Sequence, residues 1–146
     1  MPSNATLYDT DFHAWANEQA ELLRAGKLSE ADIPNIAEEI ESMGRSERRE
    51  LVSRLTVLLM HLLKWQFQPG LRGKSWHSTI KEQRYRLDRH LHHNPSLRSH
   101  VAEAMEESYA LAVIRGERET ALDGASFPST SPFTFDEAMN PAFWPD

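Results

Sequence analysis

Hydrophobic residues recur at helical spacing along nearly the whole chain. Apolar positions repeat every three or four residues in segments 12–23, 33–43, 76–91 and 97–112. No segment alternates apolar and polar residues between hairpin turns, as a strand would. The pattern predicts an all-α protein, a single-domain bundle of about five helices spanning residues 1–146, with residues 1–8 flexible.

The segment from Ser46 to Phe67 is predicted to be the central helix. It carries two neighbouring apolar stripes, Leu51, Leu55, Leu58 and Leu62 in one and Val52, Leu59 and Leu63 in the other. A helix that is apolar over so much of its circumference is usually covered by neighbours on several sides. Gly44 either kinks the preceding helix or separates it from this one, and the sequence leaves both readings open.

The last twenty residues, 127–146, have a different composition. They contain four of the eight prolines and five aromatic residues. Aromatic side chains bury large areas at low entropic cost, so this segment is expected to pack on the bundle. Docking of a partner protein is the alternative. Thr134 is predicted to cap a short helical turn from Phe135 to Met139.

Charge is distributed in three blocks along the chain. Residues 1–44 carry a net charge of −7, residues 45–100 carry +8 and six of the seven histidines, and residues 101–146 carry −7. The total of −6 therefore conceals a basic centre between two acidic arms. A basic centre favours acidic partners, whereas folded acidic arms would cancel much of that attraction.

The overall composition excludes several classes of protein. There is no cysteine, so disulfides, thiolate metal sites and thiol catalysis are excluded. Hydrophobic residues make up 40% of the chain and charged residues 26%, which is typical of globular proteins. No apolar run approaches the roughly 20 residues of a membrane span, and the first residues lack the pattern of a signal peptide. A cytoplasmic protein with no membrane partner is predicted.

His61, Lys64 and Trp65 form the most distinctive group of polar and aromatic side chains. His61 and Lys64 lie on the one polar stripe of the central helix, and Trp65 is next to them. A helix that covers this stripe must satisfy both groups, and Glu38 or Glu41 are candidate partners. If these residues have only a structural role, they form a set of buried hydrogen bonds. If they have a functional role, they line a polar pocket. The candidate patch comprises Glu38, Glu41, His61, Lys64, Trp65, Trp76 and Arg84.

Metal and catalytic sites receive little support from the sequence. Glu39 and Glu41 lie on different sides of their helix and cannot easily share an ion, although Glu38 and Glu41 could. His90 and His93 share a helix face, but they have no carboxylate in register and their position suits the negative end of the helix dipole. No nucleophile triad or phosphate-binding loop is present. No metal, cofactor or catalytic residue is predicted.

Several stretches resemble a bacterial family known as domain of unknown function number twenty-nine. The similar residues are 7–12 with Trp15, 36–50, 58–65, 75–76, 79–80, 83–84 and 94–97. The joint occurrence of the acidic stretch 38–41 and the stretch from His61 to Trp65 is distinctive. The resemblance implies a compact, all-helical bacterial protein and supplies no established reaction.

Three functional hypotheses follow. The first is a non-enzymatic interaction or regulatory module that forms a homodimer or binds a protein partner through helix faces. The second is nucleic-acid binding through the basic residues of segment 45–100, with tryptophan stacking. The third is a metal-dependent enzyme that uses Glu38, Glu41 and His61, with or without His77.

Overall fold

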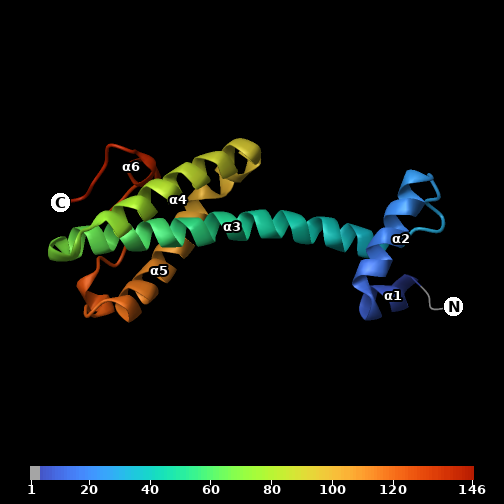
Figure 1. The fold of residues 1–146 in the computed structure, drawn as a ribbon, viewed down its shortest axis with the longest axis horizontal. Helices are drawn as coiled ribbons and strands as arrows, with labels where there is room; N and C mark the ends of the chain where they lie inside the picture. The colour runs from blue at the N-terminus through green and yellow to red at the C-terminus, as the bar shows by residue number, and fades with distance from the viewer. Residues whose placement is uncertain (1–3) are drawn as a thin grey trace. The chain divides into compact units, whose positions relative to one another are not determined.

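A computed structural model describes residues 4–146 of the chain and confirms the all-α class. These residues form six α-helices and three 3₁₀ turns, with no strand among them (Figure 1). The helices are α1 (Asn4–Thr10), α2 (Phe12–Arg24), α3 (Ile33–Phe67), α4 (Lys74–His93), α5 (Val101–Glu119) and α6 (Phe135–Met139), and the turns are η1 (Pro69–Leu71), η2 (Pro95–His100) and η3 (Gly124–Ser126). None of the described helices is both long enough and apolar enough to cross a membrane.

The chain divides into two compact units. The N-terminal unit ends at Ser46, and the C-terminal unit runs from Glu47 to Asp146. That both units belong to one domain stays a prediction. Of the predicted flexible residues 1–8, residues 1–3 lie outside the described part of the chain, and residues 4–8 belong to α1.

Helix α3 is continuous through Gly44, so the two helices expected on either side of this glycine are one. A glycine inside a helix costs only about 1 kcal/mol relative to alanine, and no proline follows it to remove a hydrogen bond. The helix begins directly after Asp32. The carboxylate of Asp32 accepts hydrogen bonds from the side chain and backbone N–H of Asn35, and these bonds lower the pKa of Asp32.

The N-terminal unit is built around Trp15 of α2. This side chain is buried, and its indole N–H donates to Asp32 at 3.0 Å. The rings of Tyr8 and Phe12 pack against it, with centroids 4.7 and 5.4 Å from that of Trp15. Gly26 follows the end of α2 with a φ of +73°, the left-handed conformation in which glycine commonly caps a helix. The start of α3 is therefore anchored to the first two helices.

Tyr8 of this unit is expected to titrate far above its usual range. Its hydroxyl donates to Glu39 Oε1 at 2.5 Å, and this hydrogen bond, together with the charge of Glu39, raises the pKa of Tyr8 to about 12. In Glu39→Gln the pKa should fall back toward 10, because the negative charge is removed. The ionised fraction of the Tyr8 ring at pH 11, measured by NMR, should therefore be low in the unmodified chain and high in Glu39→Gln. A pKa near 10 in the unmodified chain would contradict the contact.

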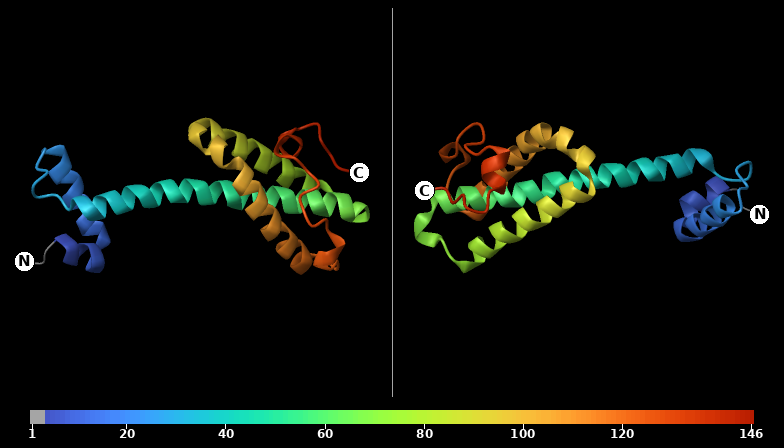
Figure 2. Two further views of the ribbon diagram at one scale, coloured as in Figure 1. Left: turned by 180° about the vertical axis from the view of Figure 1, so that it is seen from behind. Right: turned by 90° about the horizontal axis from the view of Figure 1, so that it is seen from above.

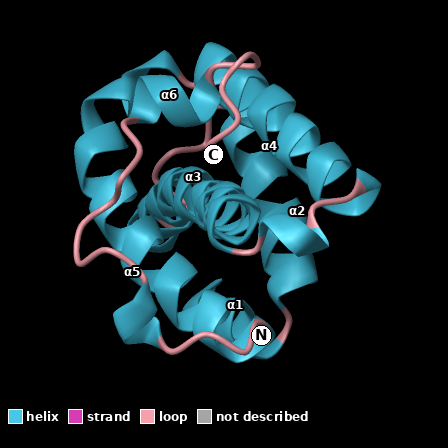
Figure 3. Cartoon of the chain, turned by 90° about the vertical axis from the view of Figure 1, so that its left-hand side faces the viewer, coloured by secondary structure: helices cyan, strands magenta, loops and turns pink. Residues whose placement is uncertain are grey.

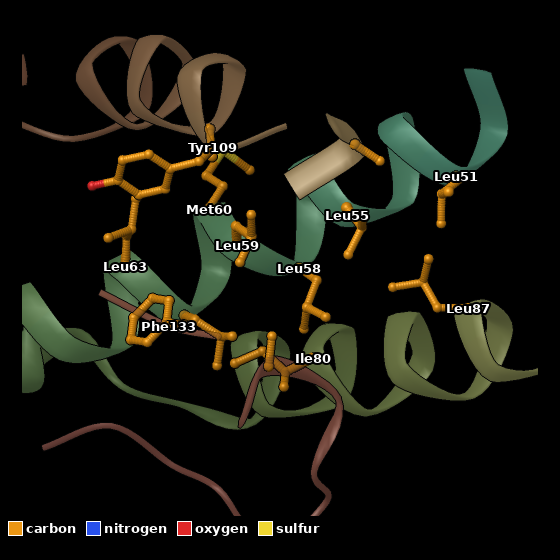
Figure 4. Packing of buried hydrophobic residues seen from close by; sticks show 14 of the residues in the cluster. Leu51, Leu55, Leu58, Leu59, Met60, Leu63, Ile80, Leu87, Tyr109 and Phe133 are labelled. Atoms are coloured by element: carbon orange, nitrogen blue, oxygen red, sulfur yellow. The ribbon is translucent and has the colours of Figure 1, made fainter. Parts of the chain in front are cut away.

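The C-terminal unit is organised around the second half of α3, as predicted. All six leucines of α3 from Leu51 to Leu63 are almost completely buried. Helix α4 covers them on one side with Ile80, Leu87 and Leu91, and α5 contributes Tyr109 and Ala112 (Figures 3 and 4). Each buried leucine stabilises the fold by about 1.5–3 kcal/mol, which makes this helix the centre of the core.

The segment after α5 runs back across the C-terminal unit and reaches α4 through α6 (Figure 2). Phe127 and Phe133 are buried against the core, and the Tyr109 hydroxyl donates to Pro128 O at 2.6 Å. The predicted turn from Phe135 to Met139 is confirmed as α6. Its cap is reciprocal, because Thr134 accepts from the Glu137 backbone while the Glu137 carboxylate accepts from the Thr134 backbone.

Gly116 allows the segment to approach α5 closely. A Cβ atom at this position would lie 3.4 Å from the ring of Phe127, at the tight limit of such contacts. On its other side the ring of Phe127 meets Phe67 of α3 edge-on, at a centroid distance of 5.5 Å. The ring is therefore held between α5 and α3.

Candidate functional site

Five of the seven predicted patch residues lie in the C-terminal unit, and Glu38 and Glu41 lie in the N-terminal unit. These two carboxylates pair with Arg45, at 2.9 and 3.8 Å. The partner of Lys64 is instead Glu119 of α5, with Nζ 3.7 Å from Oε1. The expected pairing of Lys64 with Glu38 or Glu41 is thus replaced by a contact inside the C-terminal unit.

His61 Nδ1 and the ammonium group of Lys64 each have a partner within the C-terminal unit. Lys64 is 8% exposed, and its ammonium group also lies 5.6 Å from the ring centre of Trp76. His61 Nδ1 is 2.8 Å from the carbonyl oxygen of Val57, to which it can only donate. Burial lowers the pKa of His61, and the positive charge of Lys64 acts in the same direction. His61 is therefore neutral at pH 7 and makes a local helix bond.

Trp65 belongs to a cluster of rings that joins α3, α4 and the C-terminal segment. Its ring centroid lies 4.8 Å from that of Trp144 and 6.1 Å from that of His77. His77 and Trp144 are stacked, with an interplanar angle of 3° and a centroid distance of 4.3 Å. The guanidinium of Arg72 lies over the ring of Trp65 and donates to the carbonyl oxygen of Pro145 at 3.1 Å. Sequence reasoning identified Trp65 but not its partner Trp144, which is 79 residues away.

Arg84 fastens the C-terminal segment to α4. Its side chain is almost completely buried, and Nε and Nη2 donate to the carbonyl oxygens of Ala138 and Phe143, each at 2.7 Å. The guanidinium also lies over the ring of Trp144, with Cζ 5.2 Å from its centre. Burial lowers the pKa of Arg84, yet arginine remains charged in proteins. The guanidinium of Arg84 therefore binds backbone carbonyl oxygens. It forms no ion pair with a carboxylate of the described residues.

A concave feature of the C-terminal unit lies between α5 and the segment 124–135. We call it the α5 groove; it has a volume of about 860 Å³. One wall is a stripe of α5 at helical spacing, comprising Ala102, Met105, Glu106, Tyr109, Ala110 and Val113. The other wall is formed by the segment, and its apolar members are Ala125, Phe127, Pro128, Phe133 and Phe135. The composition of segment 127–146 predicted that it packs on the bundle, but not that it forms a groove with α5.

The α5 groove is apolar at its base and has few charged atoms. Tyr109, Phe127 and Phe133 are nearly inaccessible to solvent and form its floor with the core. Serine and threonine residues of the segment supply hydroxyl groups along one side. Glu106 is the one charged residue among the described residues of the lining. An apolar cleft with few polar groups is the usual form of a binding site.

Comparison with known proteins gives one match to a family. The model of the family described as Domain of unknown function DUF29 matches residues 7–144. The chain belongs to this family. No match was found among curated proteins or among solved structures. Membership of DUF29 confirms the predicted resemblance, and it assigns no activity or ligand.

The basic centre of this DUF29 chain is largely occupied by internal contacts. Of the twelve arginines and lysines of segment 45–100, seven have partners: Arg45, Arg48, Arg54, Lys64, Arg72, Arg84 and Arg86. The other five are Arg49, Lys74, Lys81, Arg89 and Arg98, all exposed. A cavity of about 660 Å³ beside Arg84 and Trp144 also includes Lys81 and Tyr85, but Asp88 lies in its wall. The chemistry of a nucleic-acid interface is therefore weaker in this chain than the sequence suggested.

Proposed function

We propose that this protein is an interaction module whose α5 groove binds an amphipathic helix, with one apolar and one basic face, of a partner protein. The observation that carries this proposal is the apolar groove itself, which exposes a continuous stripe of α5 beside the segment 124–135. No catalytic role is proposed. Location in the cytoplasm stays a prediction from composition, and a bacterial source stays what the family resemblance implies.

The dimensions of the groove suit a helix. From Ala102 to Val113 the α5 stripe covers eleven residue steps, which correspond to about 16 Å along the helix axis, or three turns. Helices that bind in grooves typically insert side chains spaced by three, four and seven residues, which span about 10 Å, so the groove accommodates one such set with a further turn. A partner helix of three to four turns therefore fits the groove.

The charge around the groove favours a basic partner. Glu106 lies in the wall, and segment 101–146, which supplies both walls, contains nine acidic residues and two basic ones. Complementary charge at the rim of an interface accelerates association and selects the partner. The same acidity disfavours nucleic acid and a second copy of this segment, because both carry negative charge.

Reversing the charge of the groove wall should weaken the binding of a partner helix at least tenfold. A photo-crosslinking amino acid at Ala102, which is exposed in the wall, captures the neighbour in cells, and mass spectrometry maps the linked segment. A synthetic peptide of that segment is then titrated by fluorescence anisotropy against Glu106→Lys and Glu107→Lys. Both glutamates are exposed on α5, but only Glu106 lines the groove.

The expected result is a linked segment with one apolar and one basic helical face, whose peptide loses affinity with Glu106→Lys and little with Glu107→Lys. A crosslink to another copy of this chain would replace the proposal with self-association. A linked segment without helical amphipathicity, or equal losses for the two variants, would also overturn it.

A further inference from the structure

Three side chains that can bind a metal ion converge where α3 passes the end of α4. Glu47 and Glu50 lie one helical turn apart on α3, and His90 reaches them from α4. His90 Nδ1 is 3.2 Å from Glu50 Oε2 and 3.6 Å from Glu47 Oε2. The cluster is separate from the α5 groove and shares no residue with the predicted patch.

The orientation of His90 is fixed from its other nitrogen. Nε2 lies 2.8 Å from the backbone carbonyl oxygen of Glu47, which only accepts hydrogen bonds, so Nε2 carries a proton. The imidazole is 8% exposed and cannot turn away into solvent. Nδ1 is therefore directed at the two carboxylates. This is how metal-binding histidines are usually held, with one nitrogen bonded to a carbonyl and the other presented to the ion.

A positive charge between the members of the cluster would offset their mutual repulsion. A neutral imidazole would direct the lone pair of Nδ1 at two negatively charged oxygens, which is repulsive at 3.2 Å. Either a proton on Nδ1 or a metal ion removes this repulsion. The carboxylates are 47% and 41% exposed, so an ion has access from solvent.

The distances agree with a metal ion as the bridging charge. Bonds of about 2.0–2.2 Å in a tetrahedral site place the ligand atoms about 3.4 Å from each other. The two distances from Nδ1 bracket this value, and one ligand atom from each of the three residues lies within 4.8 Å of the others. Small side-chain rotations of the two glutamates are sufficient to complete the geometry.

Neighbouring residues hold the carboxylates in position. Arg54 donates to Glu50 Oε1 through Nε and Nη2, at 3.1 and 2.9 Å, which leaves Oε2 available for an ion. The amide of Asn94 donates to the His90 carbonyl at 3.1 Å and lies 3.5 Å from Glu47 Oε2. Such supporting contacts orient metal ligands in known sites.

We propose that Glu47, Glu50 and His90 bind a divalent transition-metal ion of the Zn²⁺ class. Imidazole together with carboxylates suits zinc and its neighbours, whereas Mg²⁺ and Ca²⁺ prefer ligands that are all oxygen. Three protein ligands leave a fourth position for water. The site ties α3 to α4 at the first turn of the C-terminal unit.

Calorimetric titration of the full chain, purified without a histidine tag and freed of metal, tests the site. Zn²⁺ should bind with a stoichiometry of one and raise the melting temperature, and Mg²⁺ should do neither at the same concentration. Glu50→Gln and His90→Gln should each reduce the affinity for Zn²⁺ at least tenfold. His92→Gln is the matched control, because His92 is exposed at the same helix end but lies outside the cluster.

Two outcomes would overturn the proposal. Absence of saturable Zn²⁺ binding would show that the cluster does not hold a metal ion. Loss of binding with His92→Gln, and retention with the other two variants, would place the ion on the exposed histidines. If His90→Gln does not fold by circular dichroism, Glu50→Gln decides, because glutamine still accepts from Arg54.

Discussion

Replacing Leu58 by alanine is expected to lower the free energy of unfolding of the C-terminal unit by about 2–5 kcal/mol. Leu58 is 0% exposed and points from α3 toward α4, where Ile80 and Leu87 lie (Figure 4). The substitution removes three heavy atoms from a site bounded by rigid helices, so the cavity cannot close fully. Urea denaturation followed by tryptophan fluorescence measures the loss, since Trp65, Trp76 and Trp144 belong to this unit.

Leu71→Ala is the matched control, because it removes the same atoms from a side chain that is 64% exposed in the same unit. Its effect should stay within about 0.5 kcal/mol, as for most surface substitutions. Equal effects of the two substitutions would show that α3 is not the covered centre of the unit.

Arg84→Met is expected to lower the free energy of unfolding by about 2–4 kcal/mol and to release the end of the chain. Methionine fills similar space but leaves the carbonyl oxygens of Ala138 and Phe143 without their donors. The cation over Trp144 is also lost. Urea denaturation measures the free energy. Hydrogen exchange of the backbone amides after Ala138 measures the release of the segment, which should exchange faster in the variant.

Arg86→Met provides the comparison for this second substitution. Arg86 is 51% exposed on the same helix and forms one surface ion pair with Glu82, at 3.6 Å. Exposed pairs contribute about 0–1 kcal/mol, so little change in free energy or exchange is expected. If both variants exchange at the rate of the unmodified chain, Arg84 does not fasten the segment.

Local features of the fold were predictable, since neighbours in sequence determine them. Thr134 and Glu137 form the cap of α6 across three residues, and the leucine stripes of α3 follow from helical periodicity alone. Whether the helix continues through Gly44 was left open, because the modest free-energy cost of a glycine is compatible with either a break or an uninterrupted helix.

Contacts between distant residues could not be predicted from spacing. Lys64 pairs with Glu119, and His90 meets Glu47 and Glu50, only because α4 and α5 pack on α3 in one particular register. A shift of α4 by one residue would rotate His90 by about 100° and separate it from the carboxylates. The histidines at this helix end were visible in the sequence, but the carboxylates that make His90 a candidate metal ligand come from another helix.

Gly116 has a consequence for how this protein could diverge from its relatives. It does not line the α5 groove, yet the ring of Phe127 that forms part of the groove wall rests against it. An added Cβ atom would meet this ring at 3.4 Å, and Phe67 on the other side of the ring leaves it little room to yield. The wall of the groove is thus backed by a residue that does not itself line the groove.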